Sequence, residues 1–132
     1  MGYRSDVAYT IRFVHEDETN NKQSFYVFLA EAKANAATAV CFEEHGWMEF
    51  VVDEDNYRIN FFAEGVKWYE SYADVQCHEA LLSLASEWDE DNHAHIAYQF
   101  VRIGEESDDI EDKRSESADD WIYLERSISR DW

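Results

Sequence analysis

Two histidines late in the chain have the spacing of a metal-binding pair. His93 and His95 lie two residues apart on or beside a predicted strand, so both rings project to one face, as zinc ligands must. Zinc needs three or four ligands, and His78 on a predicted helix is the only further candidate. Because polar residues before a strand are usually a solvated turn, we expect no metal here. A small-ligand or metal-binding module is kept as an alternative function.

Clustered carboxylates suggest a calcium site in two places. The sequence Asp-Glu-Asp-Asn occurs at 53–56 and again at 89–92. Tyr57 and His93 stand where an EF-hand loop needs a further Asp or Asn, so the calcium pattern fails and turn chemistry explains both copies. The remaining acids offer too many pairs for a catalytic dyad to be chosen among them.

The motifs of nucleophilic catalysis are missing from the sequence. There is no G-x-S-x-G motif and no glycine-rich phosphate loop. Cys77 is next to His78, but neighbours on a helix point in different directions. Cys41 and Cys77 lie in apolar helical stretches without C-x-x-C spacing, which indicates two reduced core thiols. We therefore expect a protein that is not an enzyme and has no cofactor.

The charge of the chain says more about its partners than any motif does. Thirty Asp and Glu against eleven Lys and Arg give a formal charge of −19, although 45% of the residues are hydrophobic and 16% aromatic. That apolar content predicts a folded core with acid displayed on its surface. A negative field of this size repels nucleic acid and anionic lipid, and attracts basic protein surfaces.

Carboxylates held on a rigid surface can imitate the phosphate pattern of DNA and gain fast association with a basic groove. An alternative without a binding role is that the acidic residues only keep a small domain soluble, although 30 acids against 11 bases exceed what solubility needs. The candidate partner-binding residues are Glu43, Glu44, Asp53, Glu54, Asp55, Asp89, Glu90, Asp91, Glu105, Glu106, Asp108, Asp109, Glu111 and Asp112.

Hydrophobic periodicity and capping signals define the elements that carry these residues. Val7, Tyr9, Ile11 and Phe13 alternate as in a strand, while Asn20 with Gln23 and Ser71 with Asp74 resemble capping boxes. A local alternative for residues 25–29 is a strand. The predicted elements are a strand at 6–14, a helix from Asn20 toward Gly46, a hairpin of strands 47–52 and 57–63, a helix from Ser71 to near Asp89, and strands at 94–103 and 121–124.

This order predicts one α+β domain spanning residues 1–132. It matches the ferredoxin-like split β-α-β fold, β-α-β-β-α-β, in which two helices cover one face of an antiparallel sheet. The strand at 121–124 would extend an edge of the sheet, and residues 105–120 would form an acidic loop. Gly65 would mark a bulge at the end of the hairpin formed by strands 47–52 and 57–63. The second sheet face would stay open, with aromatic side chains as a candidate interface for a partner or a second copy.

Two further features concern location. The first ten residues lack an apolar core of a signal peptide, and no window approaches the roughly 18 apolar residues of a membrane helix. We therefore expect a soluble protein retained in the cytoplasm, without membrane contact.

Two short segments resemble known proteins. The opening MGYRSDV at 1–7 and RIGEESDDIE at 102–111 are similar to segments of small acidic proteins encoded by bacteriophages and prophages. The resemblance carries no catalytic motif and transfers no functional residue. It implies a phage origin, and small acidic phage proteins include anti-CRISPR and anti-restriction inhibitors, some of which mimic DNA. We therefore expect a phage-encoded inhibitor that occupies a basic nucleic-acid channel in a bacterial host, with a homodimeric accessory phage protein as another alternative.

Overall fold

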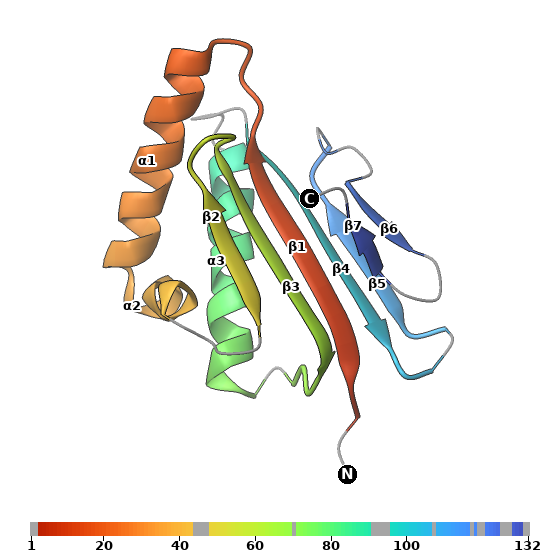
Figure 1. The fold of residues 1–132 in the computed structure, drawn as a ribbon. Helices are drawn as coiled ribbons and strands as arrows, with labels where there is room; N and C mark the ends of the chain where they lie inside the picture. The colour runs from red at the N-terminus through yellow and green to blue at the C-terminus, as the bar shows by residue number, and fades with distance from the viewer. Residues whose placement is uncertain are drawn as a thin grey trace.

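The computed structural model describes residues 3–43, 48–69, 71–90, 96–106, 108–116, 118, 121–124 and 128–130, the last two ranges only by their backbone from 123 onward. Figure 1 shows the arrangement of its helices and strands. In chain order they are β1 (Ser5–Phe13), α1 (Glu18–Ala34), α2 (Ala36–Ala39), the 3-10 helix η1 (Val40–Phe42), β2 (Glu49–Asp53), β3 (Arg58–Val66), α3 (Ala73–Glu90), β4 (Ile96–Gly104), β5 (Ile110–Arg114), β6 (Ile122–Leu124) and β7 (Ile128–Arg130).

The main sheet has five antiparallel strands in the order β2-β3-β1-β4-β5, so the predicted α+β class is confirmed. β1 lies at its centre, and Tyr9 is opposite Phe61 of β3 and Phe100 of β4. The alternation in β1 is the one expected, because its odd-numbered apolar residues all belong to the main core.

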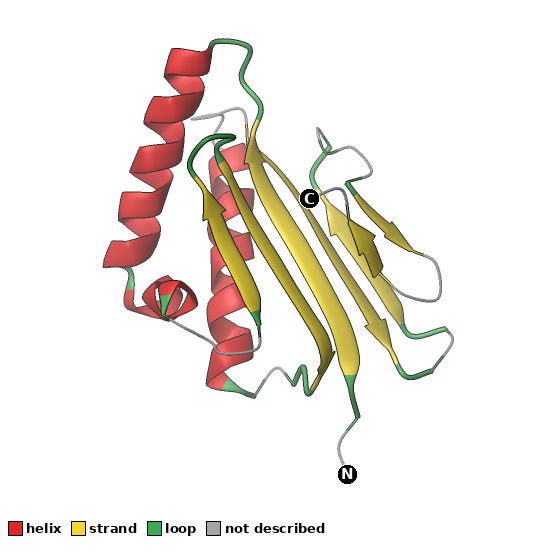
Figure 2. Cartoon of the chain, in the orientation of Figure 1, coloured by secondary structure: helices red, strands yellow, loops and turns green. Residues whose placement is uncertain are grey.

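The two long helices cover one face of this sheet (Figure 2). Phe25 and Phe28 of α1 and Leu81 of α3 are fully buried and pack in one cluster with the odd-numbered residues of β1. These helices bury apolar stripes of three- and four-residue spacing, as amphipathic helices do. None of the helices described in the structure is both long enough and apolar enough to cross a membrane.

The first helix differs from its prediction at both ends. It begins before Asn20, because the Asp17 side chain accepts hydrogen bonds from the backbone N–H groups of Thr19 at 2.9 Å and Asn20 at 3.3 Å. It ends at Ala34, where Asn35 leaves the helical conformation and caps α2 through the N–H of Ala37. A single helix continuing toward Gly46 is therefore wrong, because the Asn35 cap starts a new one.

The hairpin of β2 and β3 and the helix α3 largely agree with their predictions. Residues 53–57 turn between β2 and β3, as expected, and Tyr57 adopts a left-handed φ of 57° there. Gly65 has a φ of 65°, and the pairing register of β1 with β3 shifts between Ser5 and Val7, so the bulge is confirmed. α3 begins at Ala73, so Ser71 does not cap it directly, and it ends at Glu90, close to the expected Asp89.

The C-terminal third contains the largest departure from the prediction. Residues 110–114 are not loop but the edge strand β5, paired with β4. Their charges are tolerated there because Arg102 of β4 is directly opposite Glu111 and holds its carboxylate. The expected strand at 121–124 exists as β6, but it pairs with β7 in a separate two-stranded sheet and does not extend the main one.

The second sheet face is not open across its middle, contrary to expectation. The fully buried Gln99 of β4 accepts hydrogen bonds from the backbone N–H groups of Trp121 and Ile122, each at 3.1 Å, and donates one to the Ile122 carbonyl at 3.2 Å. The Arg12 guanidinium lies 4.4 Å from the centre of the Trp121 ring. Ile122 packs on Ala8 and Val101, so the chain itself covers the face that we expected a partner to occupy.

Candidate functional site

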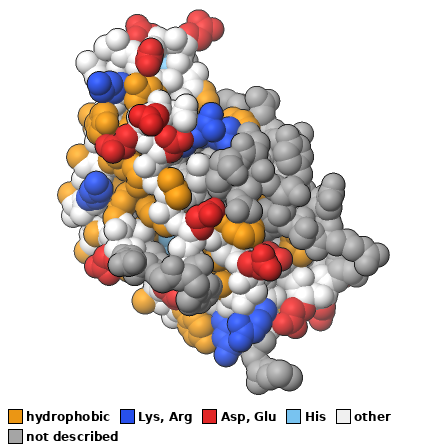
Figure 3. Space-filling model, viewed as in Figure 1, with side chains coloured by type: hydrophobic (Ala, Val, Ile, Leu, Met, Phe, Trp, Pro, Cys, Tyr) orange, Lys and Arg blue, Asp and Glu red, His pale blue; other side chains and the backbone are white. Residues whose placement is uncertain are grey.

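The carboxylates lie on the outside of the molecule. Among the residues that the structure describes, the buried polar set contains no Asp or Glu. In the space-filling view the acidic side chains form several separate groups, with apolar side chains between them (Figure 3). The described acid is therefore displayed at the surface, as expected, but it is distributed over more than one part of it.

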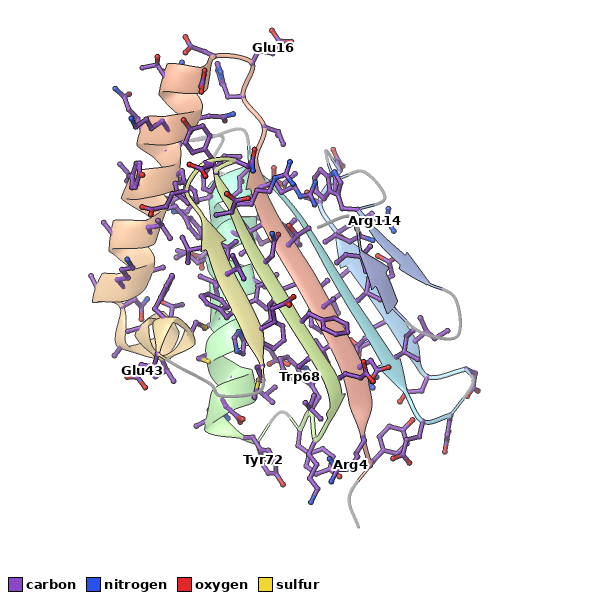
Figure 4. The ribbon with its side chains drawn as sticks, in the orientation of Figure 1. Arg4, Glu16, Glu43, Trp68, Tyr72 and Arg114 are labelled. Carbon is purple, nitrogen blue, oxygen red and sulfur yellow. The ribbon has the colours of Figure 1, made fainter. Side chains whose placement is uncertain are left out.

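One acidic group lies where β1, β2 and α3 end. Contacts between aromatic rings connect these parts. The ring centre of Phe13 in β1 lies 6.4 Å from that of Trp88 in α3 and 5.7 Å from that of Phe25 in α1. The ring centre of Phe25 lies in turn 5.7 Å from that of Tyr57 in the turn between β2 and β3. The stretch 16–18 before and at the start of α1 lies at the same end, where Figure 4 shows Glu16. We call this group the β2–β3 end; it comprises Glu16, Asp17, Glu18, Asp53, Glu54, Asp55, Asp89 and Glu90.

Hydrogen bonds within the turn at the β2–β3 end hold Asp53, and Arg58, which is opposite it on β3, makes a smaller contribution. Asp53 accepts hydrogen bonds from the Asn56 side chain at 2.9 Å and from the backbone N–H groups of Asp55 and Asn56 at 3.2 Å. The bond from Asn56 holds the pKa of Asp53 below its usual value. Glu54 accepts a hydrogen bond from Tyr26 at 3.2 Å. No Lys or Arg in the described part of the chain forms an ion pair with Asp53, Glu54 or Asp55.

The other acidic group follows the turn between β4 and β5. We call it the β4–β5 hairpin; it comprises Glu105, Glu106, Asp108, Asp109, Glu111 and Asp112. Arg102 lies at its centre, with Nη2 2.6 Å from Asp109 Oδ1 and Nε 2.8 Å from Glu111 Oε1. Arg114 Nη2 lies 2.6 Å from Asp112 Oδ2. Asp109, Glu111 and Asp112 are therefore paired within the chain.

Hydrogen bonding ties the β4–β5 hairpin to the start of the chain. Tyr3 Oη donates to Asp109 at 2.7 Å and accepts from the Glu106 backbone N–H at 3.0 Å. The Arg102 guanidinium, with the Tyr3 hydroxyl second, holds the pKa of Asp109 below its usual value. These carboxylates organise the fold locally, which sequence reasoning missed because it treated them all as displayed acid.

Of the remaining predicted residues, the structure describes only Glu43. Glu43 is the exposed residue that ends η1, at the other side of the molecule from Glu16 (Figure 4). Glu44, Asp91, His93 and His95 lie outside the described residues. The predicted partner-binding residues that the structure describes are thus spread over several surfaces, and Glu16, Asp17 and Glu18 are additions that their adjacency in the sequence could have signalled.

A groove separates α3 from the edge of the sheet. It has a volume of about 350 Å³ and is lined by Glu79 and Leu82 of α3 and by Tyr98, Phe100 and Lys113 of the strands. Lys113 Nζ lies 5.9 Å from the centre of the Phe100 ring. The groove therefore combines charges of both signs with aromatic surface, which suits a small amphipathic molecule better than a basic protein.

A polar cluster is buried between the sheet, α3 and η1. Cys41, Cys77 and His78 each offer a ligand atom, and these atoms all lie within 4.8 Å of one another. Tyr9 Oη lies 2.7 Å from His78 Nδ1. Both thiols are free and buried, as expected. Cys77 and His78 are neighbours on α3 and both are buried, because α3 is covered by the sheet and by η1.

The two thiols of this cluster influence each other directly. They share a hydrogen bond, which lowers the pKa of Cys77. The same bond and burial raise the pKa of Cys41. Cys77 also contacts the Asp74 carbonyl at 3.1 Å. The sequence could not show this pairing, because Cys41 reaches α3 only through the fold.

The described residues thus provide three candidate sites: acid on the exterior, a groove of mixed charge, and a buried cluster of two thiols and an imidazole. The first suits a basic partner, the second a small molecule and the third a thiophilic ion. No known family model matches the chain, and neither a characterised protein nor a solved structure shows significant similarity to it.

Proposed function

We propose that the protein is a non-catalytic acidic binding protein that occupies a basic surface of another protein. The observation that carries the proposal is the β2–β3 end, where carboxylates from three parts of the chain, most of them exposed, form no ion pairs among the described residues. Such carboxylates attract a cationic surface without first giving up an internal cation. At a net charge of −19 the field also accelerates encounter with that surface.

The β2–β3 end is favoured over the β4–β5 hairpin for an energetic reason. A carboxylate that already pairs with an arginine has part of its charge neutralised, and a partner's cation would have to compete for it. Asp109 and Glu111 are in this position because both contact Arg102. Glu54 and Asp55 are exposed and free of such competition from described cations. The contact is therefore assigned to the β2–β3 end.

The kind of partner is proposed from charge and from the phage-like segments. A basic surface that normally holds nucleic acid presents the cations that an acidic exterior of this strength would meet. We propose that the partner is a nucleic-acid-binding complex of a bacterial defence system, in the cytoplasm of the host, and that the protein is an anti-CRISPR-like inhibitor encoded by a phage. In this proposal the carboxylates imitate a phosphate backbone, and the protein itself binds no nucleic acid, membrane or cofactor.

We also propose that the main elements have the ferredoxin-like split β-α-β arrangement. The order β1-α1-β2-β3-α3-β4 and the antiparallel neighbours β2-β3-β1-β4 support it. The short helices α2 and η1, the edge strand β5 and the pair β6-β7 are then additions to that arrangement. The fold carries many functions, so the binding proposal depends on the surface alone.

The proposal is tested by binding at two salt concentrations with a matched pair of variants. Purified CRISPR effector complexes and restriction enzymes are immobilised, and binding is measured at about 50 and 150 mM salt, with DNA as competitor. We expect affinity to fall at least about tenfold over this range, and DNA to compete. Glu54→Lys/Asp55→Lys should weaken binding at least about tenfold further.

The control variant reverses the same number of charges elsewhere. Glu106→Lys/Asp108→Lys alters two exposed carboxylates of the β4–β5 hairpin and leaves Arg102 and its partners intact. This variant should weaken binding by less than about threefold, because it changes only the net charge of the protein and not the proposed contact. Equal losses in both variants would refute the assignment to the β2–β3 end. Absence of affinity for every basic complex even at low salt would refute the proposed function itself.

A further inference from the structure

We propose that Cys41, Cys77 and His78 form a buried binding site for a thiophilic metal ion, Zn²⁺ or Cu⁺. This site is distinct from the histidine pair suggested by sequence and is independent of the acidic surface. Its basis is geometric: two sulfur atoms and one ring nitrogen, from α3 and from η1, lie within 4.8 Å of one another. Two thiolates and an imidazole are a ligand set that selects such ions over Mg²⁺ or Ca²⁺.

The surroundings of the cluster favour an ion over exposed reactive thiols. Cys41 and His78 are fully buried and Cys77 is 2% exposed. Aromatic rings enclose the imidazole, the nearest being Phe61 with its centre 4.2 Å from that of His78. A dry apolar shell of this kind strengthens coordination and excludes competing water. The Tyr9 hydroxyl, 2.7 Å from Nδ1, fixes the orientation of the ring from the sheet side.

Metal binding at the cluster would require the thiols to lose their protons. Their sulfur atoms lie within 4.8 Å of each other, close enough to share one ion. Coordination would release the thiol protons to solvent, and the affinity should therefore decrease as the pH falls. Ligands from α3 and from the three-residue η1 would be joined by one ion, so binding would stabilise the packing of η1 on α3.

The test begins with the reduced full-length protein, refolded with and without metal in a buffer containing millimolar Mg²⁺ to saturate exposed carboxylates. Zn²⁺, Cu⁺ and the spectroscopic probe Co²⁺ are then titrated. We expect a single tightly bound ion of Zn²⁺ or Cu⁺ per chain, a rise in Tm of several degrees, and thiolate-to-cobalt charge-transfer absorption with Co²⁺. X-ray absorption of the zinc form should show sulfur at about 2.3 Å.

Matched variants separate this site from the alternative. Cys41→Ser and Cys77→Ser should each lower the affinity for Zn²⁺ more than about 100-fold, with helical content checked by circular dichroism. His93→Ala/His95→Ala should leave it unchanged. The opposite result, in which the cysteine variants bind normally and the histidine variant does not, would overturn the proposal.

Two outcomes in the unaltered protein would also overturn it. One is that neither Zn²⁺ nor Cu⁺ binds stoichiometrically in the presence of Mg²⁺. The other is a bound zinc without sulfur in its coordination shell. Both measurements use the wild-type chain, so they decide the question even if serine at a buried cysteine prevents folding.

Discussion

The β2–β3 end and the β4–β5 hairpin contain the same residue types but use them differently. At the first, Asp53 binds its own turn, and Glu54 and Asp55 point outward without ion pairs among the described residues. At the second, Arg102 joins Asp109 and Glu111 into a network. The difference teaches that ion pairing with an arginine, as at Arg102, and not the density of acid, separates the carboxylates that organise the fold from those that stay available to a partner.

The largest expected effect on stability comes from removing the arginine at the centre of the network. Arg102→Met should lower the free energy of unfolding by about 1–2 kcal/mol, because it leaves Asp109 and Glu111 without their partner; the partial exposure of both carboxylates limits the loss. Arg58→Met, at the start of β3 near the other end, is the control and should cost less than about 0.5 kcal/mol. Urea denaturation measures both, and equal losses would abolish the distinction between the two regions.

A second change reaches the same network through the backbone. A methyl group at Gly104 would collide with the Asp109 carboxylate and the Tyr3 hydroxyl. Gly104→Ala should therefore lower the free energy of unfolding by about 1 kcal/mol, because Asp109 must move away from Arg102. Combined with Arg102→Met in a double-mutant cycle, its effect should be clearly less than additive. Full additivity would show that the two residues act independently.

The pH dependence of stability should distinguish the two regions as well. The pKa of Asp109 is lowered chiefly by Arg102, so its contribution is present above its unfolded pKa of about 3.9 and is lost as the pH falls through the lower folded value. The stability difference between wild type and Arg102→Met should therefore shrink below about pH 4. Asp53, whose pKa is lowered mainly by Asn56, should lose its contribution equally in both proteins. Urea unfolding at pH 6 and pH 3 checks this, and a constant difference contradicts it.

The smallest effects should have opposite signs at the two regions. Glu54→Gln/Asp55→Gln removes repulsion between acids that form no ion pair in the described part of the chain, and should raise the free energy of unfolding by at most about 0.5 kcal/mol. Asp109→Asn/Glu111→Gln removes the same formal charge but leaves Arg102 without its carboxylates, and should lower Tm. Calorimetry at low salt measures both changes. A fall in Tm for both variants would mean that the β2–β3 carboxylates are structural too.

Patterns that depend on local spacing were readable from the sequence. The alternation of β1, the turn at 53–57 and the bulge at Gly65 follow from period-two apolar residues and from residues that favour turns or a positive φ. The break at Asn35 was missed because the alanines around it favour helix on both sides, and only the cap to Ala37 reveals the restart.

Features that depend on contacts across the fold were not readable. β5 contains four charged residues in five, which by composition alone indicates a loop; its pairing with β4 places Arg102 opposite Glu111. Cys41 and Cys77 are far apart in the sequence and meet only because η1 packs on α3. The acidic residues themselves were found by composition, but their division into paired and unpaired groups required the positions of the arginines.

The hydrogen bonds of the Gln99 amide can form only late in synthesis of the chain. It binds the backbone of Trp121 and Ile122, which leave the ribosome more than 20 residues later. Until then Ala8 and Val101 lack the cover of Ile122, so a nascent sheet of β1 to β4 would expose apolar surface on this face. The acidic stretch between β4 and this segment emerges first, and like charge of this kind opposes association between chains.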